Sequence, residues 1–91
     1  MSLDEIEKIE SSLADFVISR SLVFSGKKED LPLDKSLVES GILDSYEMVE
    51  LLHFAETNWK IQFVRAELTR EKLGSIKKLS QLISSKISSN Q

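Results

Sequence analysis

Residues 41–45, with the sequence Gly41-Ile42-Leu43-Asp44-Ser45, have types and spacing that could support chemistry in this 91-residue chain. A helical apolar pattern follows them, so we expect Asp44 and Ser45 at the exposed start of a helix. Free backbone N–H groups and partial positive charge at such a start favour an attached phosphate. Ser45 is therefore well placed to carry a phosphate ester.

No catalytic base accompanies this serine. The one histidine, His53, lies eight residues later, about 12 Å along a helix, which is too far to activate the hydroxyl. The chain has no Cys, so it supplies neither a thiolate nucleophile nor a thiolate metal site, and a single His excludes a multi-His metal centre. We therefore expect that the protein is not an enzyme and that another protein must activate Ser45.

A structural role for the same residues is also open. Asp44 and Glu47 have the spacing of a capping box, and Asp-Ser before an apolar helix is typical of an ordinary N-cap. In this alternative the chain is an unmodified small helical protein-interaction module, and Ser45 is only a helix cap. Covalent modification of Ser45 is the property that separates the two hypotheses.

The composition indicates a single helical domain. Apolar residues make up 41% and charged residues 30% of the chain, and only three Gly and one Pro are present, which leaves little punctuation for hairpins. No apolar run approaches the roughly 20 residues that span a bilayer. The acidic N-terminus is unlike a signal or transit peptide, so we expect a cytoplasmic protein.

The charges are unevenly distributed along the chain. Residues 1–58 carry 13 acidic and 5 basic side chains, whereas residues 59–91 carry 2 acidic and 7 basic ones. The basic side chains are diffuse and have no interleaved aromatic residues, so the pattern does not favour nucleic-acid binding. The acidic part suits a basic partner protein.

Apolar periodicity predicts an all-α fold, a small bundle of three long helices and one short helix. The helices are expected at about 3–20, from 44 or 45 to about 58, near 67–72, and from a cap at Ser75 onward. A long connection over 21–43 separates the first two, and Ser36 is expected to cap a short turn in it with Glu39. Apolar residues predict that this connection packs onto the helices: Leu31, Leu33, Leu37, Val38, Ile42 and Leu43.

Two further boundaries follow from the pattern. Trp59, Ile61 and Phe63 alternate as in a strand, but in a helical chain we expect them to form a packed loop. Residues 1–85 are expected to form the domain and residues 86–91 a frayed C-terminal tail.

The stretch 37–52, LVESGILDSYEMVELL, closely resembles the carrier-protein family of acyl and peptidyl carriers. Their attachment motif is Asp-Ser followed by an apolar residue, at the start of the second helix after a Gly-containing loop. Residues 59–63 are similar to the family's aromatic-x-Ile stretch, and residues 67–82 to its third and fourth helices. The resemblance covers about residues 3–85 and implies the four-helix carrier fold.

The resemblance implies that Ser45 receives 4'-phosphopantetheine from coenzyme A. A separate Mg-dependent phosphopantetheinyl transferase performs that transfer, and the thiol of the arm then holds an acyl or aminoacyl group as a thioester. The implied partners are this transferase, an acyl- or aminoacyl-activating enzyme, and acyltransferases or synthases of fatty-acid, lipid or related biosynthesis. A carrier that docks on several enzymes in turn is expected to be a monomer.

The resemblance also implies a docking surface on the second helix. Asp44 matches the family's aspartate before the serine, and Leu51 matches a core position. Glu47, Glu50 and Glu56 lie where family members present acidic residues to basic partner enzymes. Tyr46 stands where Leu or Met is usual, and the 40–45 sequence is more similar to specialised stand-alone carriers, including D-alanyl and other aminoacyl carriers. The expected partner contacts are Asp44, Tyr46, Glu47, Met48, Glu50 and His53.

Overall fold

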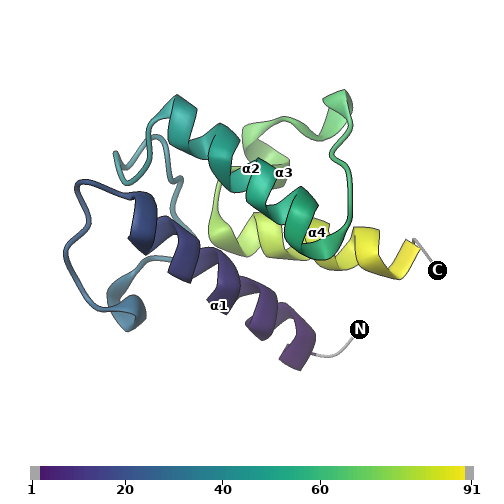
Figure 1. The fold of residues 1–91 in the computed structure, drawn as a ribbon, viewed down its shortest axis with the longest axis horizontal. Helices are drawn as coiled ribbons and strands as arrows, with labels where there is room; N and C mark the ends of the chain where they lie inside the picture. Colours follow the sequence, from purple (N-terminus) through teal and green to yellow (C-terminus); the bar gives the residue numbers. More distant parts are fainter. Residues whose placement is uncertain (1–2, 90–91) are drawn as a thin grey trace.

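The computed structural model describes residues 3–89, and this part of the chain contains helices and turns but no strand. The all-α prediction of a small bundle with three long helices and one short helix is confirmed (Figure 1). The elements are α1 (Leu3–Arg20), the 3₁₀ turn η1 (Lys28–Asp30), α2 (Ser45–Trp59), the 3₁₀ turn η2 (Arg65–Glu67), α3 (Arg70–Leu73) and α4 (Ile76–Ser89).

Helices α1 and α4 form the main contact of the bundle. Ile9, Leu13 and Val17 recur every four residues on one face of α1 and are buried, as helical periodicity requires. On α4 the buried positions include Ser80 and Ser84, both fully buried. The Ser80 hydroxyl donates to the carbonyl oxygen of Lys77 (2.8 Å), so this small side chain lies in the core with its polar atom paired.

Helix α2 packs against both α1 and α4 and completes the core (Figure 1). Leu51 and Ala55, one turn apart, are fully buried, and the expected core role of Leu51 is confirmed. Phe54 stacks on Phe16 of α1 with ring centroids 4.6 Å apart, and Trp59 meets Phe54 edge-on at 5.9 Å. These aromatic contacts fix the approach of α2 to α1.

The connection between α1 and α2 is tied to the other end of the chain by backbone hydrogen bonds. The N–H of Leu37 donates to the carbonyl oxygen of Gly74 (3.0 Å), and the N–H of Lys77 donates to that of Leu33 (2.8 Å). Leu31, Leu37, Ile42 and Leu43 are buried as predicted, whereas Leu33 and Val38 are exposed. Leu33 contributes its backbone oxygen to this contact, while its side chain is exposed.

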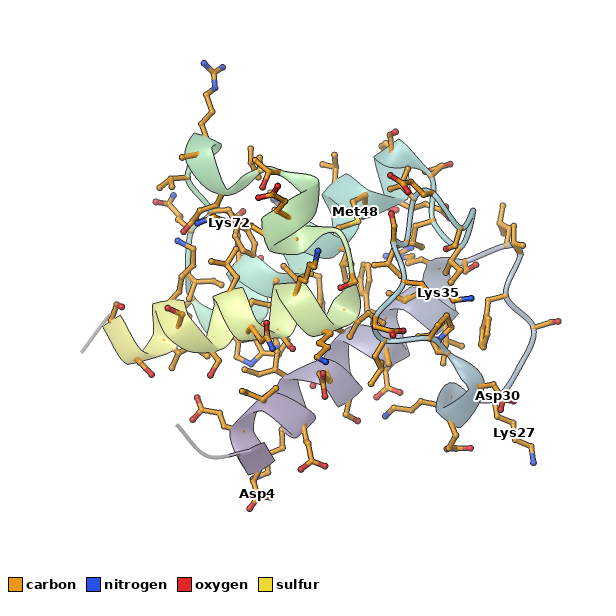
Figure 2. All side chains as sticks on the ribbon, turned by 180° about the vertical axis from the view of Figure 1, so that it is seen from behind. Asp4, Lys27, Asp30, Lys35, Met48 and Lys72 are labelled. Atoms are coloured by element: carbon orange, nitrogen blue, oxygen red, sulfur yellow. The ribbon has the colours of Figure 1, made fainter. Side chains whose placement is uncertain are left out.

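The same connection is also attached to α1. Lys28 forms an ion pair with Asp15 (3.0 Å) and donates a hydrogen bond to Ser11, while the outer tip of the connection carries Lys27 and Asp30 (Figure 2). Ser36 accepts the N–H of Glu39 (3.1 Å), which confirms the expected capped turn.

The segment after α2 is a packed loop, as predicted for Ile61 and Phe63, whereas Trp59 is the last residue of α2. Lys60 ends the helix in the left-handed conformation, with φ 55°, and turns the chain so that Ile61 is buried. Trp59 and Phe63 pack against the core as partly buried residues. The Phe63 N–H donates to the Glu56 carboxylate (3.0 Å), which holds the loop against the helix that precedes it.

Two predicted boundaries near the C-terminus need correction. The short helix expected at about 67–72 is α3 at Arg70–Leu73, because Glu67 belongs to η2 instead. The expected frayed tail at 86–91 is wrong for residues 86–89, since α4 runs to Ser89. Lys86 holds that end through an ion pair with Glu67 (2.7 Å), and Ile87 packs on the core. Residues 90 and 91 lie outside the described residues.

We expect Leu37→Ala to lower the free energy of unfolding by about 2–5 kcal/mol, the usual cost of a cavity at a fully buried leucine. Leu22→Ala is the matched control, because Leu22 is 95% exposed and its truncation should change stability by less than about 0.5 kcal/mol. Urea unfolding followed by circular dichroism measures both, and equal effects would show that the connection does not stabilise the fold.

Candidate functional site

The start of α2 is closed by a capping box. The Asp44 carboxylate accepts the N–H of Glu47 (2.7 Å), and the Asp44 N–H donates back to the Glu47 carboxylate (3.0 Å). The predicted box is therefore confirmed. The N-cap is Asp44. The alternative hypothesis expected Ser45 to be the helix cap, and that expectation is wrong. Ser45 is the first helical residue, and its hydroxyl is not used to cap the helix.

The turn before α2 sets the position of Ser45. Gly41 has φ 81°, a left-handed conformation that suits glycine. The space around it is open, because no atom lies within 4 Å of where a Cβ would be. The chain then returns inward, so Ile42 and Leu43 are buried. The Leu43 N–H donates to the carbonyl oxygen of Leu37 (3.0 Å). Ser45 therefore stands two residues beyond an anchored core position and is itself exposed.

A shallow groove of about 420 Å³ adjoins Ser45. Leu22, Val23 and Val38 from the α1–α2 connection line it, with Asp44 and Glu47 at the helix start. Leu22 is 95% and Val23 72% exposed, so two adjacent apolar side chains stand uncovered beside the serine. The sequence analysis missed them; the signal was an apolar run, residues 22–24, directly after the end of α1.

The predicted docking residues separate into exposed and structural ones. Tyr46 and His53 are exposed and Glu50 is partly exposed, as docking requires. Met48 is only 8% exposed and belongs to the buried core, so its expected role as an exposed partner contact is wrong. The expected partner-facing acid Glu56 instead binds the N–H of Phe63.

A second groove, of about 480 Å³, lies between α1 and α2. Phe16 and Phe54 contribute stacked rings, and the guanidinium of Arg20 lies 5.2 Å from the centroid of the Phe16 ring. Tyr46 and His53 line the same groove, so it brings together two predicted site residues. The sequence analysis placed neither Phe16 nor Arg20 at a site, because contact between separate helices leaves no local sequence signal.

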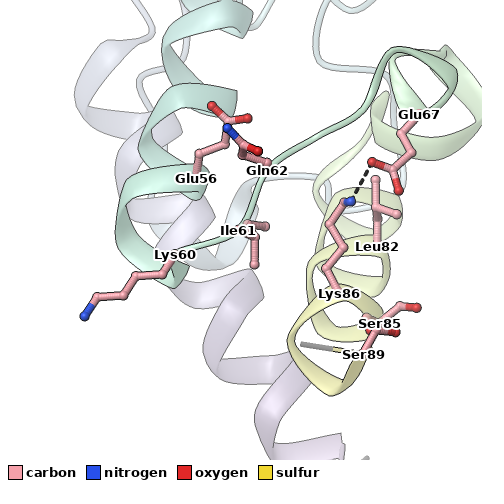
Figure 3. Close-up of a pocket in the computed structure, with 9 residues that line it drawn as sticks. All are labelled: Glu56, Lys60, Ile61, Gln62, Glu67, Leu82, Ser85, Lys86 and Ser89. Carbon is pink, nitrogen blue, oxygen red and sulfur yellow. Dashed lines mark hydrogen bonds and ion pairs between the residues drawn. The ribbon is translucent and has the colours of Figure 1, made fainter. Parts of the chain in front are cut away.

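A third hollow, of about 630 Å³, lies between the end of α2 and α4 (Figure 3). Lys86 crosses it to Glu67, whose carboxylate also accepts the N–H of Val64 (2.9 Å). Burial raises the pKa of Glu67, but the hydrogen bonds from Lys86 and Val64 and the charges of Lys86 and Lys72 outweigh it and leave the pKa below its usual value. Lys86 and Glu67, two of the charged residues that line the hollow, thus form a structural contact between η2 and α4.

Two further features, a metal-binding cluster and a membrane-spanning helix, were sought within residues 3–89. The described residues contain no group of three or more His, Cys, Asp or Glu side chains that could hold a metal ion. Within the same range, no helix has the length and apolar character needed to cross a membrane.

Comparisons of the chain with models of protein families, with curated proteins and with solved structures find no match. The structure itself defines the class of the molecule as a small helical bundle.

The Glu67–Lys86 contact should make stability depend on pH. The pKa of Glu67 is lower in the folded protein than in the unfolded chain. The contribution of Glu67 to the free energy of unfolding is therefore fully present above the unfolded pKa of about 4.3 and is lost as the pH falls through the lower folded value. We expect Glu67→Gln to lower stability at pH 7 and to differ less from wild type at pH 3. Urea unfolding at both pH values measures this, with the exposed Glu71→Gln as control. A pH-independent difference would contradict it.

Proposed function

We propose that the protein is a carrier that holds acyl or aminoacyl groups as thioesters on a 4'-phosphopantetheine arm attached to Ser45. The observation that carries the proposal is the position of Ser45, exposed at the first residue of α2 and free of the capping role that Asp44 performs. The resemblance of residues 37–52 to the carrier family supports the same function. The chain itself would perform no catalysis.

The residues around Ser45 fit such a group. The phosphate would lie at the N-terminus of α2, where the helix dipole favours negative charge, and the Asp44 carboxylate beside it is engaged with the N–H of Glu47. The adjoining groove offers Leu22 and Val23 to the apolar part of the arm. When bound, the arm supplies a reactive thiol, which a chain without Cys lacks.

Attachment requires a second protein. The Ser45 Oγ must lose its proton as its bond to phosphorus forms and the pyrophosphate bond of coenzyme A breaks, with 3',5'-ADP as leaving group. His53 is about 12 Å away along α2 and cannot accept this proton. A Mg-dependent phosphopantetheinyl transferase would supply the base, and activating enzymes, acyltransferases or synthases would then use the thiol.

The exposed face of α2 suits docking of these enzymes. Glu50 adds negative charge one turn beyond the Asp44–Glu47 pair, and Tyr46 adds a 71% exposed aromatic side chain. An acidic surface with apolar contacts is complementary to a basic surface with an apolar recess.

The unmodified interaction module remains the second candidate function. The observation that favours it is the uncovered pair Leu22 and Val23, because exposed apolar patches often mark protein-binding surfaces. The two functions differ in whether Ser45 accepts a covalent group.

We expect intact-protein mass spectrometry to show the gain of one phosphopantetheinyl group after incubation with coenzyme A, Mg²⁺ and a broad-specificity transferase. Ser45→Ala should abolish the gain and retain the fold, since Asp44 keeps the cap. Ser25→Ala, at another exposed serine, should load like wild type. A folded wild-type protein that gains nothing with several transferases would favour the interaction module.

We expect Glu50→Lys to slow the transferase reaction several-fold at low salt and less at high salt, because screening weakens attraction between charged surfaces. Glu50 is preferable to Glu47 for this test, since Glu47 is part of the capping box. The control is Glu71→Lys, an equal change of charge at an exposed position on α3. Equal rates for both variants at low salt would remove this face from the docking surface.

A further inference from the structure

The groove between α1 and α2 has an uncovered apolar surface. The rings of Phe16 and Phe54 stack with centroids 4.6 Å apart where the two helices meet, and both residues line the groove. Tyr46 and Val49, three residues apart on α2, are exposed side chains along the same groove. Covering this surface with another protein would be favourable, because apolar area would be removed from water.

Side chains of both charges border this apolar surface. Arg20, on α1, and Glu50, on α2, line the groove, and the guanidinium of Arg20 lies 5.2 Å from the centroid of the Phe16 ring. Neither Arg20 nor Glu50 forms a salt bridge with another residue of the described range 3–89. A guanidinium and a carboxylate are therefore both available to a molecule that covers the groove.

The charges select the kind of molecule that fits. A strongly basic surface would be repelled by Arg20, and a strongly acidic one by Glu50. The complementary surface has a carboxylate opposite Arg20 and a guanidinium opposite Glu50, around an apolar centre. A second copy of the same groove, turned by a two-fold rotation, supplies both groups, because residue pairs occur reciprocally in a two-fold contact.

The other uncovered apolar surface is not complementary to itself. Leu22 and Val23 border the groove beside Ser45, where the charged residues are Asp44 and Glu47. Two copies that met there would bring carboxylates together, which opposes association. The groove between α1 and α2 is therefore the better surface for contact between copies.

We propose that two copies of the chain associate through the groove between α1 and α2 and form a weak symmetric dimer. In this dimer, Arg20 of each copy faces Glu50 of the other, and Tyr46 and Val49 cover the aromatic rings of the second copy. An interface limited to one groove is small, so the dissociation constant is expected in the micromolar to millimolar range. The proposal differs from the monomer that the resemblance implies and does not depend on modification of Ser45.

Such a dimer would compete with the docking of enzymes. Tyr46, Glu50 and His53 are expected enzyme contacts and also line the groove, so the dimer would cover them in both copies. Well below the dissociation constant the chain is a single copy, and transferase rates measured there report docking alone.

Sedimentation equilibrium of the full chain tests the proposal. We expect the average mass to rise from that of one chain toward twice that value as the concentration increases from about 10 µM to about 1 mM. The mass of one chain throughout this range would overturn the proposal. Growth beyond two copies would also overturn it, because a two-fold contact closes on itself.

Charge reversal tests the reciprocal contact. Arg20→Glu alone and Glu50→Arg alone should each raise the dissociation constant about tenfold, because both charged contacts of the dimer become repulsive. An equal mixture of the two variants should restore association to near the wild-type level, since each introduced charge then faces its opposite on the other chain. A mixture that associates no better than the single variants would overturn the proposal.

Substitutions at exposed apolar residues identify the surface. Val49→Asp should raise the dissociation constant about tenfold, because it places a charge in the apolar centre of the contact. Leu22→Asp and Val64→Asp, equal changes of charge at exposed apolar positions outside the groove, should leave it unchanged. Loss of association in Leu22→Asp with none in Val49→Asp would assign the contact to the groove beside Ser45 and overturn the proposal. Circular dichroism verifies that each variant is folded.

Discussion

The placement of Leu37 in the core is the constraint on which the arrangement of the helices depends. Its N–H donates to the Gly74 carbonyl oxygen at the junction of α3 and α4, and its own carbonyl oxygen accepts the N–H of Leu43. One fully buried residue therefore joins the long connection to the C-terminal half and to the turn that precedes α2. Ser45 follows Leu43 by two residues. Its position therefore depends on the contact between Leu37 and Gly74, which is far from Ser45 in the sequence.

The long connection is ordered without being regular secondary structure. Lys28 attaches its first part to α1, and the Ser21 hydroxyl donates to the carbonyl oxygen of Ile42 (2.6 Å) near its end. These contacts satisfy polar groups at separate points, while leucine side chains supply the burial between them. The connection can thus leave Leu22 and Val23 uncovered beside the start of α2 and still retain a defined path.

Local features of this fold could be predicted from the sequence, and features made by contact between distant segments could not. The capping box of Asp44 and Glu47 depends on residues three apart, so its spacing is visible in the chain. The burial of Met48 depends on which side of α2 faces α3, which apolar type alone does not reveal. Likewise, the end of α4 is held by the partner of Lys86, a residue 19 positions earlier in the chain. The groove that joins Phe16 to Val49 has the same non-local origin.

Asp44 caps α2, whereas Ser45 is its exposed first residue, and this arrangement has a consequence for the reuse of the folded protein. Since the Asp44 carboxylate caps the helix, the Ser45 hydroxyl is not needed for that cap. A group could be added there or removed by hydrolysis while the scaffold remains the same. If Ser45 carries the proposed group, adding or removing that group would leave the Asp44–Glu47 cap in place, so the scaffold would not need to refold between rounds.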